Sequence, residues 1–299
     1  MRQAMRVWRW LGVLSLVAAA GLWVLARPKP LSEASVAGLT GDPVKGELVF
    51  WASGCASCHM AAKATGEAQL VLAGGQRFPS DFGTFIAPNI SQDAAQGIGG
   101  WTLLDLANAI TRGVSPEGEH YYPALPYAAY AKMELQDVAD LYAFLKTLPA
   151  DPTPSLPHEL GFPFSRRETL GVWKLLFLSD DWALPGNLTP TATRGRYVAE
   201  AMAHCAECHT PRNLLGGLDT ARWLSGAPNP SGDGRIPNIT PGKLGWSSGD
   251  IVQYLTTGFT PEYDSVGGLM AEVVENMARL PESDRLAVAE YLLAVPSVE

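Results

Sequence analysis

Cysteine is scarce in this chain, and none is left over for an ordinary disulfide bond. The 299 residues include 4 cysteines. They form two copies of one pattern, C-x-x-C-H, at Cys55–His59 and Cys205–His209. Disulfide bonds are the default use of cysteine in an exported protein. Because every cysteine here belongs to a motif that ends in histidine, the spacing argues for a different chemistry.

Positive charge is also in short supply. The sequence has 22 Lys and Arg against 30 Asp and Glu, which gives a formal charge of −8. Its first basic residues cluster between Arg2 and Lys29, before the first acidic residue, Glu33. An acidic body repels polyanions, so we expect no nucleic-acid partner and favour partners that present a basic patch. With 47% hydrophobic and 17% charged residues, the bulk of the chain is not of the disordered class.

Only one long apolar run is present, at Leu11–Ala26. Trp8 and Trp10 precede it, where interfacial aromatic residues belong, and basic residues flank it on both sides. We therefore expect residues 1–30 to be an N-terminal membrane anchor or signal segment. A cleaved signal peptide is the alternative, because Ala26 offers a small residue at a cleavage site. Retention is favoured because hydrophobicity persists to the end of the run, and in either case the rest of the chain is exported.

The C-x-x-C-H pattern is typical of covalent haem attachment. The two thiols form thioethers with the porphyrin vinyl groups, and the adjacent histidine binds the iron. A zinc ion shared by both cysteine pairs would leave the histidines unexplained, and a thioredoxin-like dithiol would need a preceding strand. We therefore predict two covalently bound haem c groups. The attachment residues are Cys55, Cys58, Cys205 and Cys208, and the histidine ligands of iron are His59 and His209.

The two motifs belong to a longer internal repeat. Pro88–Ile90 follows the first motif at nearly the same distance as Pro237–Ile239 follows the second. We expect the backbone carbonyl groups near Pro88 and Pro237 to accept a hydrogen bond from the ligand histidines. Each copy then has a helix start with a capping box and a final helix that ends before a proline. The capping pairs are Thr102 with Asp105 and Ser247 with Asp250, and the final helices are expected over 137–148 and 284–295.

The repeat predicts an all-α fold with two tandem domains, residues 31–150 and 189–299, joined by residues 151–188. The stretch 150–163 is rich in proline, and we expect it to contain no regular helix or strand. The stretch 166–178 is apolar and is expected to pack between the domains. A second membrane segment is the alternative there, but the stretch is too short to span a bilayer.

Methionine is the usual second axial ligand of an electron-transfer haem. Position eliminates most of the 7 methionines. Met133 precedes the final helix of the first domain, and we predict that it binds the first iron. In the second domain we prefer Met270, which follows the flexible pair Gly267-Gly268, and expect Met277 to be helical and to serve in core packing. His120 is the alternative ligand for the first iron.

Four stretches carry a resemblance to a known family: 123–133, 205–213, 237–241 and 268–274. They are similar to the cytochrome c subunits of bacterial membrane-bound alcohol, gluconate and fructose dehydrogenases. The resemblance implies tandem cytochrome c domains, with Met133 and Met270 as iron ligands. It also implies electron transfer from a periplasmic dehydrogenase towards the respiratory chain. Those subunits usually carry three haem motifs, whereas this chain has two.

We therefore expect an electron carrier rather than an enzyme. Its N-terminal helix would hold it in the inner membrane with both haem domains in the periplasm. Its partners would be a dehydrogenase or another respiratory donor, and a cytochrome or oxidase as acceptor. The alternative is a di-haem redox enzyme of the peroxidase or thiosulfate-oxidising type, in which one iron keeps an open site. Arg212 is a candidate partner for a haem propionate.

Overall fold

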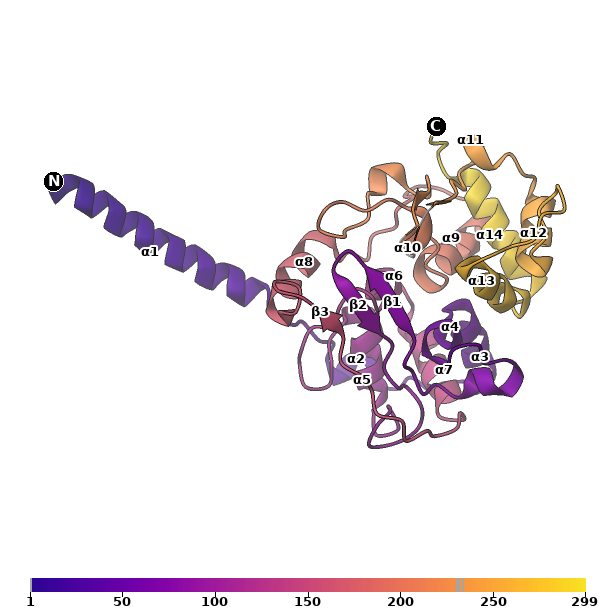
Figure 1. The fold of residues 1–299 in the computed structure, drawn as a ribbon, viewed down its shortest axis with the longest axis horizontal. Helices are drawn as coiled ribbons and strands as arrows, with labels where there is room; N and C mark the ends of the chain where they lie inside the picture. The colour runs from indigo at the N-terminus through magenta and orange to yellow at the C-terminus, as the bar shows by residue number, and fades with distance from the viewer. Residues whose placement is uncertain (1, 230–231, 233) are drawn as a thin grey trace.

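A long N-terminal helix projects from the rest of the protein. The structure is a computed structural model that describes residues 2–229, 232 and 234–299. Helix α1 (Arg2–Leu25) extends away from the body along the long axis of the molecule (Figure 1). Its segment Arg6–Leu25 is long and apolar enough to cross a membrane, and none of that segment is buried. The apolar side chains of α1 therefore have no protein core to pack against.

In the first half of the chain, helix α3 crosses helix α7 in direct contact. A Cβ atom on Gly46 of α3 would lie 1.9 Å from the carbonyl oxygen of Asp140 in α7, so only glycine permits this approach. The N–H of Asp42, the N-cap of α3, donates to Oδ1 of Asp140 at 2.8 Å. The helices of this half are α2 (Glu33–Val36), α3 (Pro43–Ala52), α4 (Cys55–His59), η1 (Gly66–Leu70), α5 (Leu103–Ala107), η2 (Asn108–Arg112), α6 (Tyr127–Tyr130) and α7 (Leu135–Leu145).

The second half repeats this crossing with helices α9 and α14. A Cβ atom on Gly195 of α9 would lie 1.8 Å from the carbonyl oxygen of Ala287 in α14. The guanidinium of Arg194 forms an ion pair with Asp284 across the same contact, with Nη2 2.8 Å from Oδ2. The helices of this half are α9 (Pro190–Arg196), η4 (Tyr197–Met202), α10 (Ala206–His209), η5 (Thr220–Arg222), α11 (Pro241–Leu244), α12 (Ser248–Thr257), α13 (Leu269–Ala278) and α14 (Glu282–Ala294).

The expected capping boxes and final helices are present. Thr102 accepts from the N–H of Asp105 and Ser247 from that of Asp250, and each aspartate accepts in return from the N–H of its cap. The final helices α7 and α14 begin two residues earlier than the apolar pattern indicates. They also end earlier, because the last turn before each proline loses its regular hydrogen bonds.

Short strands correct the all-α expectation in detail. Strands β1 (Arg77–Ser80) and β2 (Gly83–Ile86) form an antiparallel hairpin, and β4 (Ala227–Pro228) pairs with β5 (Arg235–Ile236). The prediction that residues 150–163 contain no regular structure is wrong at β3 (Glu159–Leu160), which pairs with the free edge of β2. The residues of β3 lie between prolines, so their N–H groups remain free to complete that edge.

Helix α8 (Leu170–Phe177), which follows the short helix η3 (Arg167–Thr169), lies between the two halves as expected. A Cβ atom on Gly171 would lie 1.9 Å from the carbonyl oxygen of Ala26, just after α1. On the other side, Nε1 of Trp173 donates to the carbonyl of Leu215 at 2.9 Å. The outer face of α8 nevertheless remains uncovered, because Leu176 is 60% exposed.

Candidate haem-attachment sites

Each C-x-x-C-H motif forms a single helical turn that follows a sharp bend. Gly54 has a φ of 63° and turns the chain from α3 into α4, and Tyr130 donates to the neighbouring carbonyl of Ser53 at 2.9 Å. At the equivalent place in the second half, His204 has a φ of 42°. Residues three and four apart share a helix face, so two thiols and one imidazole point to the same side of each turn. That arrangement fits a porphyrin held by two thioethers and one nitrogen ligand.

The thiols lack the features of a redox pair or a disulfide. All four cysteines are free; Cys55 and Cys205 are half-buried, whereas Cys58 and Cys208 are accessible. Burial raises the pKa of both Cys55 and Cys205 to about 12, whereas a reactive dithiol needs a lowered pKa. Within the described ranges, no group of three or more His, Cys, Asp or Glu side chains is arranged to hold a metal ion.

The two histidines predicted to bind iron, His59 and His209, are oriented by matching hydrogen bonds. Nδ1 of His59 donates to the carbonyl of Pro88, 29 residues away, at 2.8 Å. Nδ1 of His209 donates to the carbonyl of Pro237, 28 residues away, also at 2.8 Å. These bonds confirm the predicted acceptors. Burial lowers the pKa of both histidines, although each bond to proline acts in the opposite direction. The neutral imidazole therefore keeps Nε2 available as a metal ligand.

The loops that supply the proline carbonyls are tied to the motif by the backbone. The N–H of Gly74 donates to the carbonyl of His59 at 2.8 Å, and that of Gly226 donates to the carbonyl of His209 at 2.7 Å. Gly74 and Gly226 have φ values of 75° and 81°, which other residues rarely adopt. His59 and His209 are thus each held through both the side chain and the backbone.

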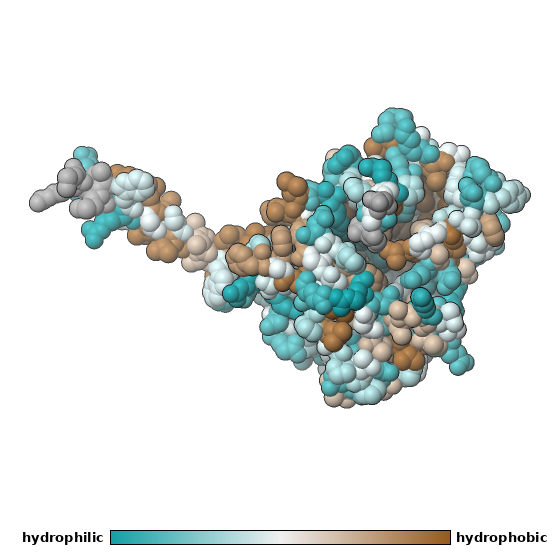
Figure 2. All heavy atoms as spheres, viewed as in Figure 1, coloured by the Kyte–Doolittle hydropathy of each residue, from teal (hydrophilic) through white to brown (hydrophobic). Residues whose placement is uncertain are grey.

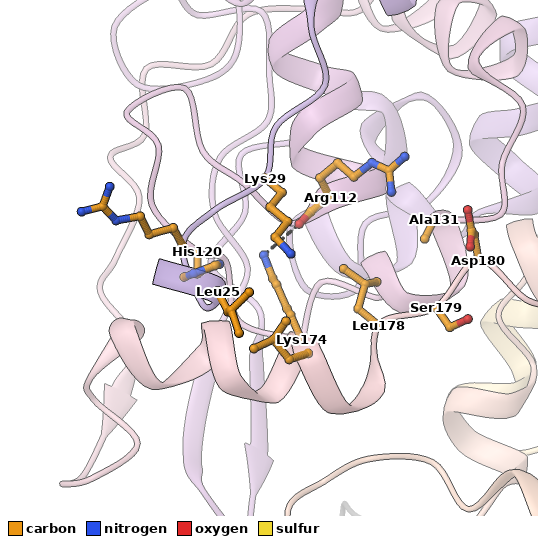
Figure 3. Close-up of a pocket in the computed structure, with 11 residues that line it drawn as sticks. Leu25, Lys29, Arg112, His120, Ala131, Lys174, Leu178, Ser179 and Asp180 are labelled. Carbon is orange, nitrogen blue, oxygen red and sulfur yellow. Dashed lines mark hydrogen bonds between the residues drawn. The ribbon is translucent and has the colours of Figure 1, made fainter. Parts of the chain in front are cut away.

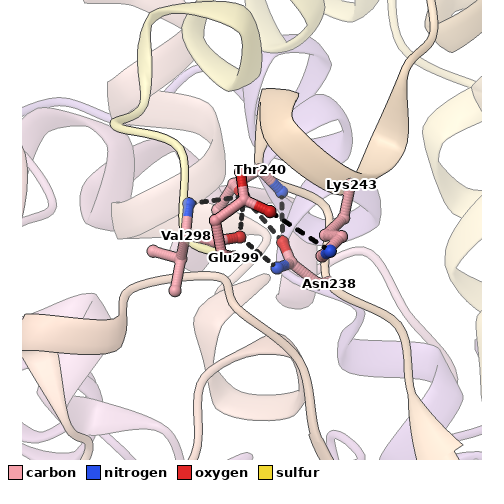
Figure 4. A network of polar contacts seen from close by, with 5 residues as sticks. All are labelled: Asn238, Thr240, Lys243, Val298 and Glu299. Carbon is pink, nitrogen blue, oxygen red and sulfur yellow. Dashed lines mark hydrogen bonds and ion pairs between the residues drawn. The ribbon is translucent and has the colours of Figure 1, made fainter.

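In the second half, Asn238, the residue after Pro237, joins the loop to the end of the chain by hydrogen bonds. We call this connection a brace. Asn238 Oδ1 accepts from the N–H and the hydroxyl of Thr240, while its Nδ2 donates to the carbonyl of Val298 at 2.8 Å (Figure 4). Lys243 and Glu299 add an ion pair, with 3.3 Å between Nζ and Oε2. The C-terminal residues therefore help to position the acceptor of the His209 hydrogen bond.

The first half uses the linker for the same purpose. Nδ2 of Asn89 donates to the carbonyls of Asp151 and Thr153 at 2.8 and 2.7 Å, and its Oδ1 accepts from the N–H of Ser91. Asn89 is only 3% exposed, so these bonds satisfy an amide that water cannot reach. The proline-rich stretch after α7 is therefore fixed in place, although it contains little regular structure.

The candidate methionine ligands occupy different environments. Met133 lies in the turn between α6 and α7 and is 6% exposed. Met270 is half-buried at the second position of α13, whereas Met277 is 3% exposed in the last turn of the same helix. The expectation that Met277 is helical is confirmed. Met270 and Met277 are seven residues apart, which is close to two helical turns, so their side chains lie on nearly the same face of α13.

Two other expected residues are already engaged. Nε2 of His120 donates to the carbonyl of Ala26 at 2.9 Å, at the end of α1, which counts against His120 as the alternative ligand. The guanidinium of Arg212 pairs with Glu207 and donates to the carbonyl of Gly216 at 2.8 Å. Arg212 is therefore committed to its own loop, and the propionate role receives no support.

The sequence did not indicate that the second half would contact the first attachment turn. Helix α13 of the second half lies next to α4 and α3 of the first (Figure 1). Nδ2 of Asn276 donates to the hydroxyl of Ser57, between the two cysteines of the first motif, at 2.9 Å. Desolvation by the surrounding protein, followed by the nearby charges of Glu272 and Cys208, raises the pKa of Cys58 to about 11.

These features define a class of protein, the c-type cytochromes. A family model for cytochrome c matches residues 43–149. A curated dihaem cytochrome c-type protein of Cereibacter sphaeroides is 56% identical over 289 residues, which is 97% of both chains. The chain belongs to this family of dihaem c-type cytochromes, and it is an electron-transfer protein that carries covalent haem c.

Subunits of dehydrogenases are more distant relatives. The fructose dehydrogenase cytochrome subunit of Gluconobacter japonicus is 35% identical over 271 residues, covering 85% of this chain and 52% of that subunit. The cytochrome c subunit of a quinone-dependent alcohol dehydrogenase of Gluconobacter oxydans is 30% identical over 276 residues, covering 85% of this chain and 55% of that subunit. The chain thus spans about half the length of these two subunits, and the resemblance expected from the sequence is confirmed.

Proposed function

We propose that this protein is a membrane-tethered electron carrier with two haem groups, one in each half. The halves are then two tandem cytochrome c domains, residues 31–150 and 189–299, with residues 151–188 between them. The observation that carries the proposal is the duplicated unit of two thiols and a histidine whose Nδ1 donates to a proline carbonyl at 2.8 Å. A duplicated attachment unit without a duplicated haem would leave the two thiols of the second copy without a function.

The side chains of each domain have distinct roles. Cys55, Cys58, Cys205 and Cys208 would hold the porphyrins, and His59, His209, Met133 and Met270 would supply the protein ligands of the irons. When bound, the haem supplies an iron that alternates between its ferric and ferrous states. The hydrogen bonds to proline carbonyls fix the imidazole orientation and raise its basicity. A methionine ligand and burial in protein both raise the reduction potential.

The contact between the halves supports electron exchange within the molecule. The hydrogen bond between Asn276 and Ser57 joins α13 to the first attachment turn. Arg279 of α13 stacks on Trp51, with 3.9 Å between the guanidinium carbon and the ring centroid, and donates to Gln69 at 3.0 Å. These contacts fix α13, the helix that carries Met270, against the first site. The two haem sites are thus held at one separation.

Helix α1 and the relatives support the proposed location and partners. Residues 1–30 serve as an uncleaved anchor in the inner membrane, and both haem domains lie in the periplasm. The dehydrogenase subunits among the relatives support a dehydrogenase as donor, with a cytochrome or oxidase of the respiratory chain as acceptor. The formal charge of −8 favours a partner with a basic docking patch.

A haem count on matched variants tests the proposal. The full-length protein should contain two haems per chain by pyridine haemochrome assay, and each double variant, Cys55→Ser/Cys58→Ser or Cys205→Ser/Cys208→Ser, should contain one. Far-ultraviolet circular dichroism checks that each variant is folded. One haem in the unmutated protein, or stoichiometric zinc in its place, contradicts the proposal.

A further inference from the structure

A basic pocket lies where α1 meets the body. It is a cavity of about 260 Å³ between the end of α1, helix α8 and the first half. Figure 3 shows Lys29 and Lys174 with their ammonium groups towards each other and Arg112 above them. Its charged and titratable lining residues are Arg27, Lys29, Arg112, His120, Lys174 and Asp180.

The pocket has an excess of positive charge that the protein does not neutralise. Four basic side chains line it against one carboxylate, Asp180. Within the described part of the chain, none of those four basic side chains takes part in an ion pair. This local positive charge is opposite in sign to the formal charge of −8 of the whole chain. Like charges held together without counterions favour an anionic ligand.

Buried polar atoms in the pocket wall add to this argument. Lys174 is 9% exposed, and its ammonium donates to the carbonyls of Arg112 and Gly113 at 2.8 and 2.6 Å. Burial lowers the pKa of Lys174 to about 7, so a nearby anion would stabilise its charged form. His120 is 6% exposed, and its Nδ1 has no hydrogen-bond partner among the described residues. One wall therefore offers a cation, and another an imidazole nitrogen that can accept a hydroxyl hydrogen.

The surroundings of the pocket identify the source of the anion. The pocket begins at the last residue of the apolar helix, Leu25, where phospholipid headgroups lie if α1 spans the bilayer. Apolar side chains surround the same junction, and Figure 2 shows brown residues gathered where α1 joins the body. The exposed ones nearby in α8 and its adjoining loops are Phe162, Phe164, Leu175 and Leu176, which are 84%, 43%, 42% and 60% exposed.

We propose that this pocket binds the headgroup of an anionic phospholipid and thereby seats the body against the periplasmic surface of the membrane. The phosphate contacts Lys29, Arg112 and Lys174, and a headgroup hydroxyl donates to Nδ1 of His120. The exposed side chains of α8 then enter the interfacial layer of the bilayer. The inference rests on the proposed membrane anchor, and it adds a specific lipid site to it. Such seating would restrict the orientations that the haem domains can take towards a membrane-bound partner.

Lipid binding to the full-length, haem-loaded protein in detergent tests the proposal. The probes are phosphatidylglycerol, phosphatidylcholine and inorganic phosphate, and bound lipid is counted by native mass spectrometry. The double variant Lys29→Gln/Arg112→Gln should weaken phosphatidylglycerol binding by about tenfold or more, because it removes two of the four basic side chains that line the pocket. The matched control Lys45→Gln/Lys63→Gln removes the same charge from exposed positions elsewhere and should not change binding.

The outcomes separate the headgroup site from the anchor. Preference for phosphatidylglycerol over phosphatidylcholine that is lost in the pocket variant, but kept in the control, supports the site. Equal binding of the two lipids, equal loss in both variants, or inorganic phosphate displacing the lipid at equal concentration overturns it. Lys29 is exposed, so Lys29→Gln alone provides a variant with little risk to folding. Release of the protein from native membranes by alkaline carbonate would contradict the anchor and the site together. Retention without lipid preference would contradict the site alone.

Discussion

The two halves of this protein are alike around their C-x-x-C-H motifs and different where they are joined to the rest of the chain. The glycine at each helix crossing, the capping box and the histidine–proline hydrogen bond recur with nearly the same geometry. The brace behind each proline differs, because Asn89 bonds to the linker whereas Asn238 bonds to the C-terminal tail. The repeated features lie around the two C-x-x-C-H motifs and their following helices, and the others depend on which part of the chain lies nearby.

The bends before the two attachment turns also share a backbone geometry but differ in the residue that adopts it. Gly54 adopts a positive φ easily because it has no side chain, whereas His204 adopts one despite its side chain. The imidazole ring of His204 lies edge-on to the ring of Tyr130 in the first half, with 5.7 Å between the centroids. A non-glycine residue in this region costs about 1 kcal/mol or more and persists only where its surroundings hold it. In the second half, contact with the first half supplies that support.

Replacing one methionine at a time distinguishes the two halves most clearly. Met133→Ala and Met270→Ala should each remove about half of the weak charge-transfer band that a sulfur ligand gives to ferric haem, lower one reduction potential, and let one haem bind carbon monoxide. Met277→Ala should do none of these and is the matched control on the same helix. If Met277→Ala removes the band and Met270→Ala does not, the ligand of the second iron is Met277.

The asparagine braces should differ in their effect on stability. Asn89→Ala leaves buried carbonyls without donors and should lower the free energy of unfolding by about 2–4 kcal/mol. Asn238→Ala acts at a half-buried position and should cost about 1–2 kcal/mol. Urea titrations followed by circular dichroism measure both. A larger loss for Asn238→Ala would show that the C-terminal tail holds its loop more tightly than the linker does.

Alkaline pH should weaken the contact between the halves. Burial, together with the hydrogen bond to Asp137, raises the pKa of Tyr197, whose hydroxyl also accepts from the N–H of Glu134 at 3.0 Å. Because the pKa is higher in the folded state, this stabilisation is complete below about pH 10 and is lost as the pH rises above it. Tyr197→Phe should therefore be less stable at pH 8 and lose less stability between pH 8 and 11.

A control for this pH experiment is Tyr263→Phe, because the Tyr263 side chain is 87% exposed. Its unfolding midpoint should follow that of the unmutated protein at every pH. If Tyr197→Phe and the unmutated protein lose stability in parallel above pH 10, the hydroxyl of Tyr197 does not link the halves in the way described.

The smallest expected effect concerns the capping boxes, and here the halves should behave alike. Thr102→Ala and Ser247→Ala each remove the hydrogen bond accepted from the N–H of the capping aspartate and the one donated to its carboxylate. Both lie at an exposed helix start, and each variant should cost about 1 kcal/mol. Thermal unfolding of the two variants provides the comparison. If the losses in free energy of unfolding differ by more than about 1 kcal/mol, one helix start has an interaction that the repeat does not explain.

Sequence reasoning succeeded where the determining interactions are local. The C-x-x-C-H turns, the capping pairs and the proline acceptors each depend on a short pattern or a repeated spacing, and their geometry follows from it. It failed where distant segments meet. Nothing in the sequence of Glu159–Leu160 shows that the edge of β2 will be free to pair with it, and nothing near Ser57 indicates that Asn276 will bond to it from more than 200 residues away. Such contacts depend on how the halves pack together.

Carbon monoxide binding by the reduced, unmutated full-length protein tests the central claim most directly, namely that both irons have a methionine opposite the histidine. A six-coordinate iron with a methionine ligand does not bind carbon monoxide readily, whereas an iron with an open position does. We predict that the absorption spectrum of the reduced protein does not change when carbon monoxide is added. A shift that corresponds to one of two haems would contradict the account, because it would show that one iron lacks its methionine.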